Sequence, residues 1–157
     1  MRVCGIDPGN HGALAIVDTT TGELVVCDMP TTVVRGKPKI DPHTMHQWLI
    51  DNGPIHHVVI EQVGGLPGMG ATSAFTFGHG LGLIEGVLTA SARRYTMVRP
   101  QQWTKHLAVS RDKGEHRQTA QRLHPDYAHL FARIKDDGRA DAALIAQWFI
   151  NTRTEET

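Results

Sequence analysis

Three short apolar runs at the start of the chain, joined by connections too short to contain a helix, constrain its fold most strongly. Residues 2–7, 12–18 and 22–29 have the pattern of strands, with turn-forming residues at Pro8-Gly9-Asn10 and Thr20-Thr21-Gly22. Connections this short join antiparallel neighbours, because a parallel crossover needs a dozen or more residues. The sequence therefore predicts an antiparallel meander.

Beyond the meander, strand and helix patterns alternate. The segment from Val33 to Lys39 is basic and punctuated by glycine and proline, which predicts an exposed loop. Asp41 followed by Pro42 marks the start of a helix that ends near Asn52-Gly53. We expect further strands at 56–60 and 95–98, and further helices at 72–92, 101–107, 112–123 and 141–151. This alternation of strands and helices predicts an α/β fold, with a mixed five-stranded sheet and helices on both faces.

Length and composition predict one domain that spans residues 1–157 and has a core of its own, since 40% of the residues are hydrophobic. No basic and apolar leader precedes the first strand, and the most apolar helix, near 80–92, is too short to cross a bilayer, so a cytoplasmic protein is expected. Cys4 and Cys27 lie in strand-like runs without a Cys-x-x-Cys spacing, which predicts reduced, buried thiols. The ten histidines show no zinc-ligand set and are expected to be ordinary surface or core residues.

Basic residues are concentrated in one stretch, although the net charge is zero. Between residues 93 and 122 the only acids are Asp112 and Glu115, whereas most of the charged residues among the first thirty are acids. The basic residues of this stretch are Arg93, Arg94, Arg99, Lys105, Arg111, Lys113, Arg117 and Arg122. This distribution predicts either one basic face beside an acidic cleft or an ordinary solvated helix surface.

Four carboxylates stand where a backbone element ends or begins. Asp7 and Glu61 each close an apolar strand, and Asp137 and Asp141 open the last apolar helix pattern. Ionised carboxylates at a buried strand end need a compensating positive charge, and hard oxygen ligands suit Mg²⁺ or Mn²⁺. Taken singly, each acid has a structural alternative as a helix cap, a turn residue or an arginine partner. Taken together, the four predict a site for one or two divalent metals.

The motifs that carry these acids resemble a known family. Gly5-Ile6-Asp7-Pro8-Gly9, then Ile60-Glu61-Gln62, then Lys135-Asp136-Asp137-Gly138-Arg139-Ala140-Asp141 occur in the order of the RuvC-type Holliday junction resolvases, particularly their phage-like branch. The segment Val98-Arg99-Pro100-Gln101-Gln102-Trp103-Thr104-Lys105 is similar to a strand-Pro-Trp-Lys segment of that branch. The resemblance runs over nearly the whole chain and implies an RNase H-like fold.

The resemblance also implies an activity and its residues. It implies a Mg²⁺-dependent endonuclease, with Mn²⁺ as a substitute, that nicks two symmetric strands of a four-way DNA junction in the cytoplasm of a bacterial or phage-infected cell. Asp7, Glu61 and Asp141 match the metal-binding acids, with Asp7 bridging two metals. Asp137 matches the fourth position, but it stands four residues before Asp141 where the bacterial enzymes have three, so Asp136 is an alternative.

Positive charge near the phosphate and contacts with DNA complete the expected site. Lys105 or Lys113 is expected to stabilise charge in the transition state, or else to contact the DNA backbone. Arg111 and Arg117 are further candidates for DNA contacts. In and after the glycine-rich loop that follows Glu61, the apolar residues that can wedge between unstacked bases are Leu66, Met69 and Phe75, although Phe75 is alternatively a core residue.

Paired nicks require two active sites, and the long helix offers a surface for a homodimer. Gly78, Gly82 and Gly86 repeat every four residues and form a bare ridge, here called the glycine ridge. Its expected apolar flanks are Phe77, Leu81, Ile84 and Leu88. The alternative is that these glycines let the helix approach its own sheet.

Three other functions fit part of the sequence. An RNase H-fold nuclease that cuts RNA/DNA hybrids or other branched DNA would use the same acids. A sugar-kinase or actin-like ATPase also begins with a strand and an Asp-x-Gly turn, but 157 residues are too few for its second lobe, so no nucleotide cofactor is expected. A non-catalytic junction-binding protein would not need all four acids.

Overall fold

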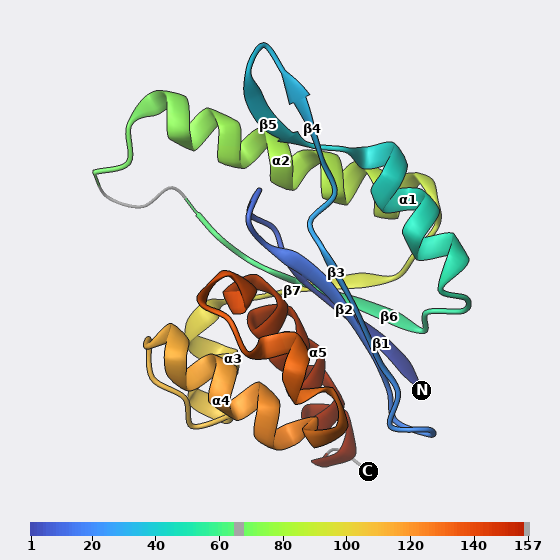
Figure 1. Ribbon diagram of the computed structural model, residues 1–157. Coiled ribbons are helices and arrows are strands. Elements are labelled where there is room, and N and C mark those ends of the chain that lie inside the picture. The colour runs from blue at the N-terminus through green and yellow to red at the C-terminus, as the bar shows by residue number, and fades with distance from the viewer. Residues whose placement is uncertain (65–67, 156–157) are drawn as a thin grey trace.

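A five-stranded sheet lies at the middle of the fold, and helices cover its two faces (Figure 1). The structure, a computed structural model, describes residues 1–64 and 68–155. Strands β1 (Arg2–Asp7), β2 (Ala13–Asp18) and β3 (Leu24–Asp28) pair antiparallel in sequence order. The antiparallel meander is therefore confirmed.

Two later strands extend the sheet on the other side of β1. Strands β6 (His57–Glu61) and β7 (Tyr95–Val98) run parallel to β1, which gives the order β3-β2-β1-β6-β7. The carboxyl ends of the three parallel strands therefore meet at one edge. The expected mixed five-stranded sheet is confirmed.

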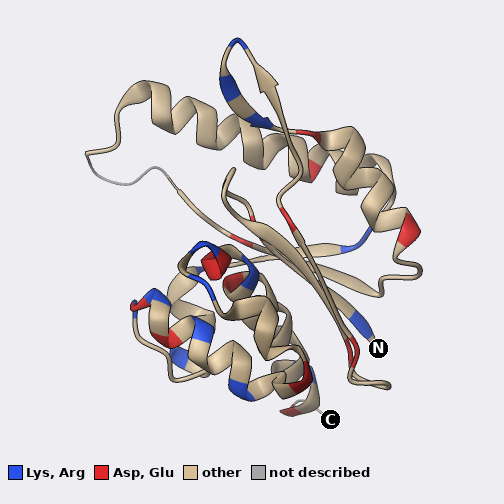
Figure 2. Ribbon diagram, viewed as in Figure 1, with Lys and Arg blue, Asp and Glu red and all other residues tan. Residues whose placement is uncertain are grey.

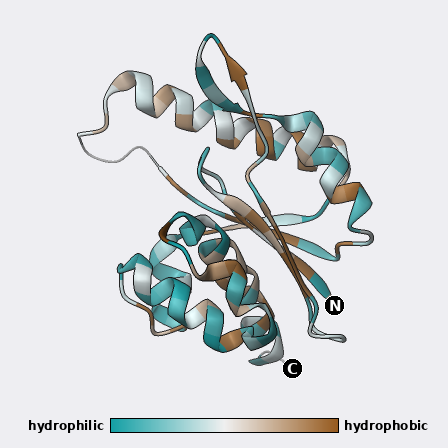
Figure 3. Ribbon diagram, viewed as in Figure 1, coloured by the Kyte–Doolittle hydropathy of each residue, from teal (hydrophilic) through white to brown (hydrophobic). Residues whose placement is uncertain are grey.

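One face of the sheet is covered by α3 (Pro100–His106), α4 (Lys113–Leu123) and α5 (Asp137–Glu155). Helix α5 lies so close to β1 that a Cβ placed on Gly5 would stand 2.0 Å from the carbonyl oxygen of Ala142. Only glycine fits there, and the small side chains of Ala142, Ala143 and Ala146 allow the same close approach. Figure 3 shows apolar residues along the strands between the two helical layers.

The opposite face is covered by α1 (Pro42–Asp51) and α2 (Ala71–Ala90). Helix α1 begins as expected, because the Asp41 carboxylate accepts hydrogen bonds from the backbone N–H groups of His43 and Thr44. Helix α2 buries Ile84 and Leu88 against the sheet. These two residues belong to the core and do not flank an exposed surface.

The expected loop at 33–39 is instead a β-hairpin, formed by β4 (Thr31–Val34) and β5 (Lys37–Ile40). Arg35 and Gly36 both have positive φ, 51° and 75°, which is the backbone of a tight two-residue hairpin turn. An arginine in that conformation gives no turn signal in the sequence, so the hairpin was missed. The exposure of the segment is confirmed.

Other boundaries differ in smaller ways. Helix α5 begins at Asp137 rather than at residue 141, and two 3₁₀ helices, η1 (Pro125–Phe131) and η2 (Ile134–Asp136), were not expected. Both cysteines are free thiols, but only Cys4 is fully buried, with its pKa raised to about 12 by burial, whereas Cys27 is half-buried. Within the described residues, no helix is long and apolar enough to cross a membrane.

Candidate active site

Asp7 and Glu61 end neighbouring parallel strands at the same edge of the sheet. Ile6 pairs with Ile60, so the next residue on each strand is the acid. Side chains alternate along a strand, and Val3 and Val59 lie in the core beneath α5, so the two carboxylates also point to the α5 face. The two acids therefore lie side by side at the start of α5.

Asp141 joins them from the second turn of α5, where its side chain is 2% exposed. The start of α5 packs closely on the turn between β1 and β2 at Gly138, and Gly12 keeps the turn itself tight. A Cβ on Gly138 would lie 2.6 Å from the carbonyl oxygen of His11, and a Cβ on Gly12 would lie 2.1 Å from that of Asp7. This packing explains why position 138, three residues before Asp141, carries no acid.

The three acids repel one another strongly. Burial, followed by the charges of Asp141 and Glu61, raises the pKa of Asp7 to about 7. Burial and the charge of Asp141 likewise raise the pKa of Glu61 above its usual value. Such a cluster of carboxylates is stable in its ionised form only beside positive charge.

Lys113 supplies one such charge from the first turn of α4. Its ammonium forms an ion pair with Asp141. Burial lowers the pKa of Lys113, but the charges of Asp141, Asp7 and Glu61 outweigh burial and raise it overall. Lys113 therefore lies beside the acids, and its expected role at the phosphate stays a prediction.

Two residues without an expected role hold the acids in place. The Trp103 indole N–H donates to Glu61 Oε1 at 2.9 Å, and His116 Nδ1 lies 2.7 Å from Asp141 Oδ1. His116 Nε2 lies 2.7 Å from the carbonyl oxygen of Ser110. The rings of Trp103 and His116 meet edge to face, with their centroids 5.1 Å apart. Burial lowers the pKa of His116, but these hydrogen bonds raise it above its ordinary value. The sequence separations of 42 and 25 residues left no local signal for either contact.

The two candidates for a fourth acid are engaged by arginines. Asp137, at the start of α5, is paired with Arg117 of α4. Asp136 is almost fully buried and accepts hydrogen bonds from the Arg133 guanidinium and backbone N–H. The structure thus brings Asp7, Glu61 and Asp141 together and gives Asp136 a structural contact.

A hollow of about 360 Å³ opens beside Glu61 between α3 and α4. Its lining residues are Glu61, Pro100, Gln101, Trp103, Thr104, Arg111, Lys113 and His116. Lys105 is exposed on α3 but does not line this hollow. Two of the basic residues expected near DNA, Arg111 and Lys113, therefore face a space that also contains an acid of the cluster.

The basic stretch does not form a single face. Figure 2 shows basic residues on α4 and the neighbouring loops, close to the acids at the start of α5. Arg94 precedes β7 and lies at the opposite edge of the sheet from the acids, and the Arg93 guanidinium donates to the carbonyl oxygen of Leu49. Arg93 and Arg94 therefore lie away from the site.

The apolar wedge candidates differ in exposure. Phe75 is 74% exposed on α2, which excludes the alternative of a core residue, and its ring is stacked with that of His79. Met69 is half-buried before the start of α2. Leu66 lies outside the described residues.

The donor chemistry of the site fits a hard divalent cation, because one buried and two partly buried carboxylates interact with a single ammonium group. In the part of the chain that the structure describes, however, no three Asp, Glu, His or Cys side chains converge closely enough to hold one metal ion. Asp141 is directed to Lys113 and His116 instead. The side chains that would hold a metal are Asp7, Glu61 and Asp141. In this structure the Lys113 ammonium is paired with Asp141.

No protein-family model matches the chain, and neither does any curated protein. Solved structures do match. RuvC of T. thermophilus, in complex with Holliday junction substrate, is 19% identical with a TM-score of 0.71, over 98% of this chain and 97% of that chain. The fowlpox virus Holliday junction resolvase matches at 14% identity and a TM-score of 0.59, over 98% and 99%. The yeast mitochondrial resolvase Ydc2 matches at 14% and 0.60, over 98% and 79%. The chain therefore has the RuvC-type, RNase H-like fold, as expected.

Proposed function

We propose that this protein is a metal-dependent endonuclease that resolves four-way DNA junctions by paired symmetric nicks. The observation that carries the proposal is the meeting of Asp7, Glu61 and Asp141, which come from three separate elements of a RuvC-type fold. Burial, and after it the charges of Asp141 and Glu61, raises the pKa of Asp7 to about 7. Holding such a cluster has an energetic cost, and binding cations would offset that cost.

Asp7, Glu61 and Asp141 would hold Mg²⁺ or Mn²⁺, with Asp137 as the candidate for a fourth ligand. Two such ions, when bound, activate water and stabilise the charge that develops on a phosphodiester during in-line displacement. The protein supplies the fixed orientation of the carboxylates. Trp103 limits Glu61 to the direction set by its indole N–H, and His116 does the same for Asp141.

Positive side chains in the hollow would position the DNA strand. Lys113 would interact with the scissile phosphate, where an ammonium stabilises the additional negative charge of the transition state. Arg111 lines the same space, and Arg117 and Lys105 lie on the same helical layer. These side chains would contact phosphates, which position DNA without reading its sequence. The exposed Phe75 and the neighbouring Met69 are candidates for contact with unstacked bases.

Two symmetric nicks require a second active site, which we assign to a second copy of the chain. The glycine ridge of α2 is exposed, and a Cβ placed on Gly78, Gly82 or Gly86 would meet no atom within 4 Å. These glycines therefore do not serve the approach of α2 to its own sheet, where Gly80 packs on Ile40 instead. An exposed glycine ridge fits the close approach of another helix.

The test is cleavage of a labelled synthetic four-way junction beside a matched linear duplex and a matched RNA/DNA hybrid, each with Mg²⁺, Mn²⁺ or EDTA. Paired symmetric nicks in the junction alone, requiring metal, are the expected result. Preferential cutting of the hybrid would indicate that the same acids act on an RNA substrate. Tight junction binding without cutting in either metal would indicate a non-catalytic junction-binding protein.

A further inference from the structure

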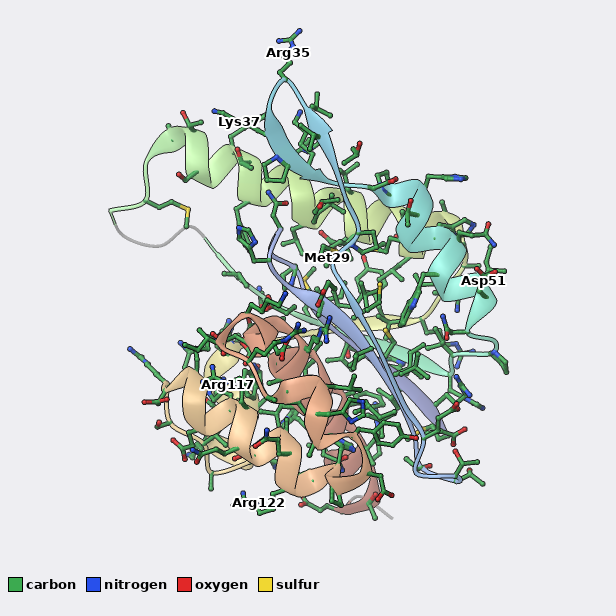
Figure 4. All side chains as sticks on the ribbon, viewed as in Figure 1. Met29, Arg35, Lys37, Asp51, Arg117 and Arg122 are labelled. Atoms are coloured by element: carbon green, nitrogen blue, oxygen red, sulfur yellow. The ribbon has the colours of Figure 1, made fainter. Side chains whose placement is uncertain are left out.

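The β4–β5 hairpin carries positive charge that nothing in the described structure neutralises. Residues 31–40 contain three cations, Arg35, Lys37 and Lys39, and no acid. All three are exposed, and none takes part in a salt bridge or side-chain hydrogen bond with any other described residue. Figure 4 shows Arg35 projecting from the tip of the hairpin, away from the body of the protein, and Lys37 over α2.

A hollow of about 310 Å³ lies between this hairpin and the first half of α2. Its lining residues are Pro8, Asn10, Lys37, Thr72, Ser73, Thr76, Phe77 and Gly80. A smaller hollow of about 120 Å³ shares Asn10, Thr76 and Gly80 with it and adds Lys39. The two form one groove, in which hydroxyl groups lie beside Phe75 and Phe77 on the α2 side and the two lysines lie on the hairpin side.

The hydroxyl groups of the groove are free to bind a ligand. Within residues 1–64 and 68–155, the side chains of Thr72, Ser73 and Thr76 have no hydrogen-bond partner. Hydroxyl groups and lysines together are common partners of the phosphates of nucleic acids. A protein of zero net charge has little long-range attraction for DNA, so local clusters of this kind must supply it.

The groove continues from the candidate active site. Asp7 is followed directly by Pro8, which lines the groove, and the Asn10 side-chain amide donates to the carbonyl oxygen of Pro38 at 3.0 Å. The turn between β1 and β2 therefore joins the acids to the base of the hairpin. The hairpin and α4 are associated with opposite faces of the sheet, so basic residues lie on both sides of the acids (Figure 2).

We infer that the hairpin and the first half of α2 form a second DNA-binding groove, which holds the sugar–phosphate backbone of one arm of the substrate. The inference rests on the proposed function for the identity of the nucleic acid. It adds to that function a second contact, away from the hollow beside Glu61, that positions an arm while a strand enters the acidic site. Lys37 is the central residue because it belongs to both the hairpin and the lining of the groove.

The test compares the salt dependence of DNA binding by Lys37→Gln and Arg94→Gln, measured in EDTA by fluorescence anisotropy with a labelled four-way junction and a duplex of one arm. Each variant removes one exposed positive charge, but Arg94 lies at the far edge of the sheet. For Lys37→Gln, the slope of log Kobs against log salt should become about 0.9 less steep. For the triple variant Arg35→Gln/Lys37→Gln/Lys39→Gln, the same slope should become about 2 to 3 less steep. Arg94→Gln should keep the wild-type slope.

Two controls separate the possible failures. Lys37→Arg keeps the charge and should keep the slope, and far-ultraviolet circular dichroism checks that each variant is folded. Equal slopes in wild type, Lys37→Gln and the triple variant would overturn the groove, and so would equal losses in Lys37→Gln and Arg94→Gln. A wild-type protein that binds DNA with the expected slopes but does not cut junctions would refute the proposed function and leave the groove intact. A wild-type protein that binds no DNA would overturn both.

Discussion

The two faces of the sheet differ in how closely their helices pack. On the α5 face, the backbones of β1 and α5 are in contact through Gly5, and Gly138 lets the start of α5 contact the backbone of the β1–β2 turn. On the α2 face, the glycines of the ridge are exposed to open space, and a groove separates α2 from the β4–β5 hairpin. The same residue type therefore serves close packing on one face and an open surface on the other.

This difference separates two tasks. The α5 face holds three mutually repelling acids, which requires backbone positions that cannot relax. The α2 face presents exposed glycines, together with groove hydroxyl groups and hairpin cations that have no hydrogen-bond or ion-pair partner among the described residues. We interpret the first face as the support of the catalytic site and the second as the surface for DNA and for a second copy.

The largest expected effect comes from Gly5→Ala. Because the new Cβ would meet the backbone of Ala142 at 2.0 Å and that of Ala146 at 2.7 Å, β1 and α5 must separate. We expect the free energy of unfolding to fall by at least about 3 kcal/mol, measured by urea denaturation. Gly78→Ala, on the open face, is the matched control and should not lower stability. A small loss in Gly5→Ala would show that α5 is not packed as described.

The second effect concerns the anchor at the start of α5, where Asp136 is buried beside Arg133. Asp136→Asn should reduce stability at pH 7 by about 2 kcal/mol, since charged hydrogen bonds are lost. Burial raises the pKa of Asp136, but the hydrogen bonds from Arg133 outweigh burial and lower it overall. The contribution of the ionised group is therefore present above about pH 4 and disappears as the pH falls through the lowered pKa.

The measurement for Asp136 is urea denaturation of wild type and variant between pH 7 and pH 3. The difference between the two should shrink on acidification. A difference that stays constant down to pH 3 would mean that the ionised carboxylate is not what stabilises the start of α5.

The third effect tests whether side chains on the α5 face hold the acids in position. Trp103→Phe keeps an aromatic ring but removes the N–H that donates to Glu61. We expect the concentration of Mg²⁺ or Mn²⁺ at half-saturation to rise about tenfold, which is typical when a partner of a metal ligand is removed. Isothermal titration of Mn²⁺ into the protein without DNA gives the same quantity independently of cleavage.

Trp48→Phe is the control for that substitution. Trp48 packs on the core of the α2 face, and its ring has no contact with the acids. It should leave metal binding unchanged. Equal effects of Trp48→Phe and Trp103→Phe would indicate a general loss of packing rather than a role of Trp103 in positioning Glu61.

The smallest expected effect is an increase in stability. Gly82→Ala, at an exposed helical position with no atom within 4 Å of the new Cβ, should stabilise the folded chain by about 0.5 to 1 kcal/mol. If the glycine ridge contacts a second copy, the same variant should weaken self-association. Thermal unfolding measures the first effect and sedimentation velocity the second. If the wild type is a dimer and Gly82→Ala self-associates as strongly, the ridge is not the interface.

The sequence predicted the parts of the molecule whose signals are local. The meander, the strands expected at 56–60 and 95–98 and the Asp41 cap depend on short patterns of apolar, turn and capping residues, and each is confirmed. The hairpin was missed because its turn places Arg35, rather than a glycine or asparagine, at its first central position.

The site shows the same limit. Strand ends and the resemblance to a family indicated Asp7, Glu61 and Asp141, whose proximity the structure shows through their electrostatic interaction. The contacts of Trp103 and His116 with these acids depend on how α3 and α4 pack on α5, which no local pattern encodes. The pairing of Asp137 with Arg117 is likewise a long-range contact, and its role as a ligand stays a prediction.

The measurement that tests the central claim most directly is cleavage and binding of the four-way junction by Asp7→Asn beside the wild type, with Mg²⁺ present. The account predicts that the wild type makes paired symmetric nicks and that Asp7→Asn makes none. It also predicts that the variant binds the junction as tightly or more tightly, because removing a negative charge beside the phosphates weakens metal binding but not DNA binding. Wild-type rates of junction cutting by a folded Asp7→Asn protein would contradict the account.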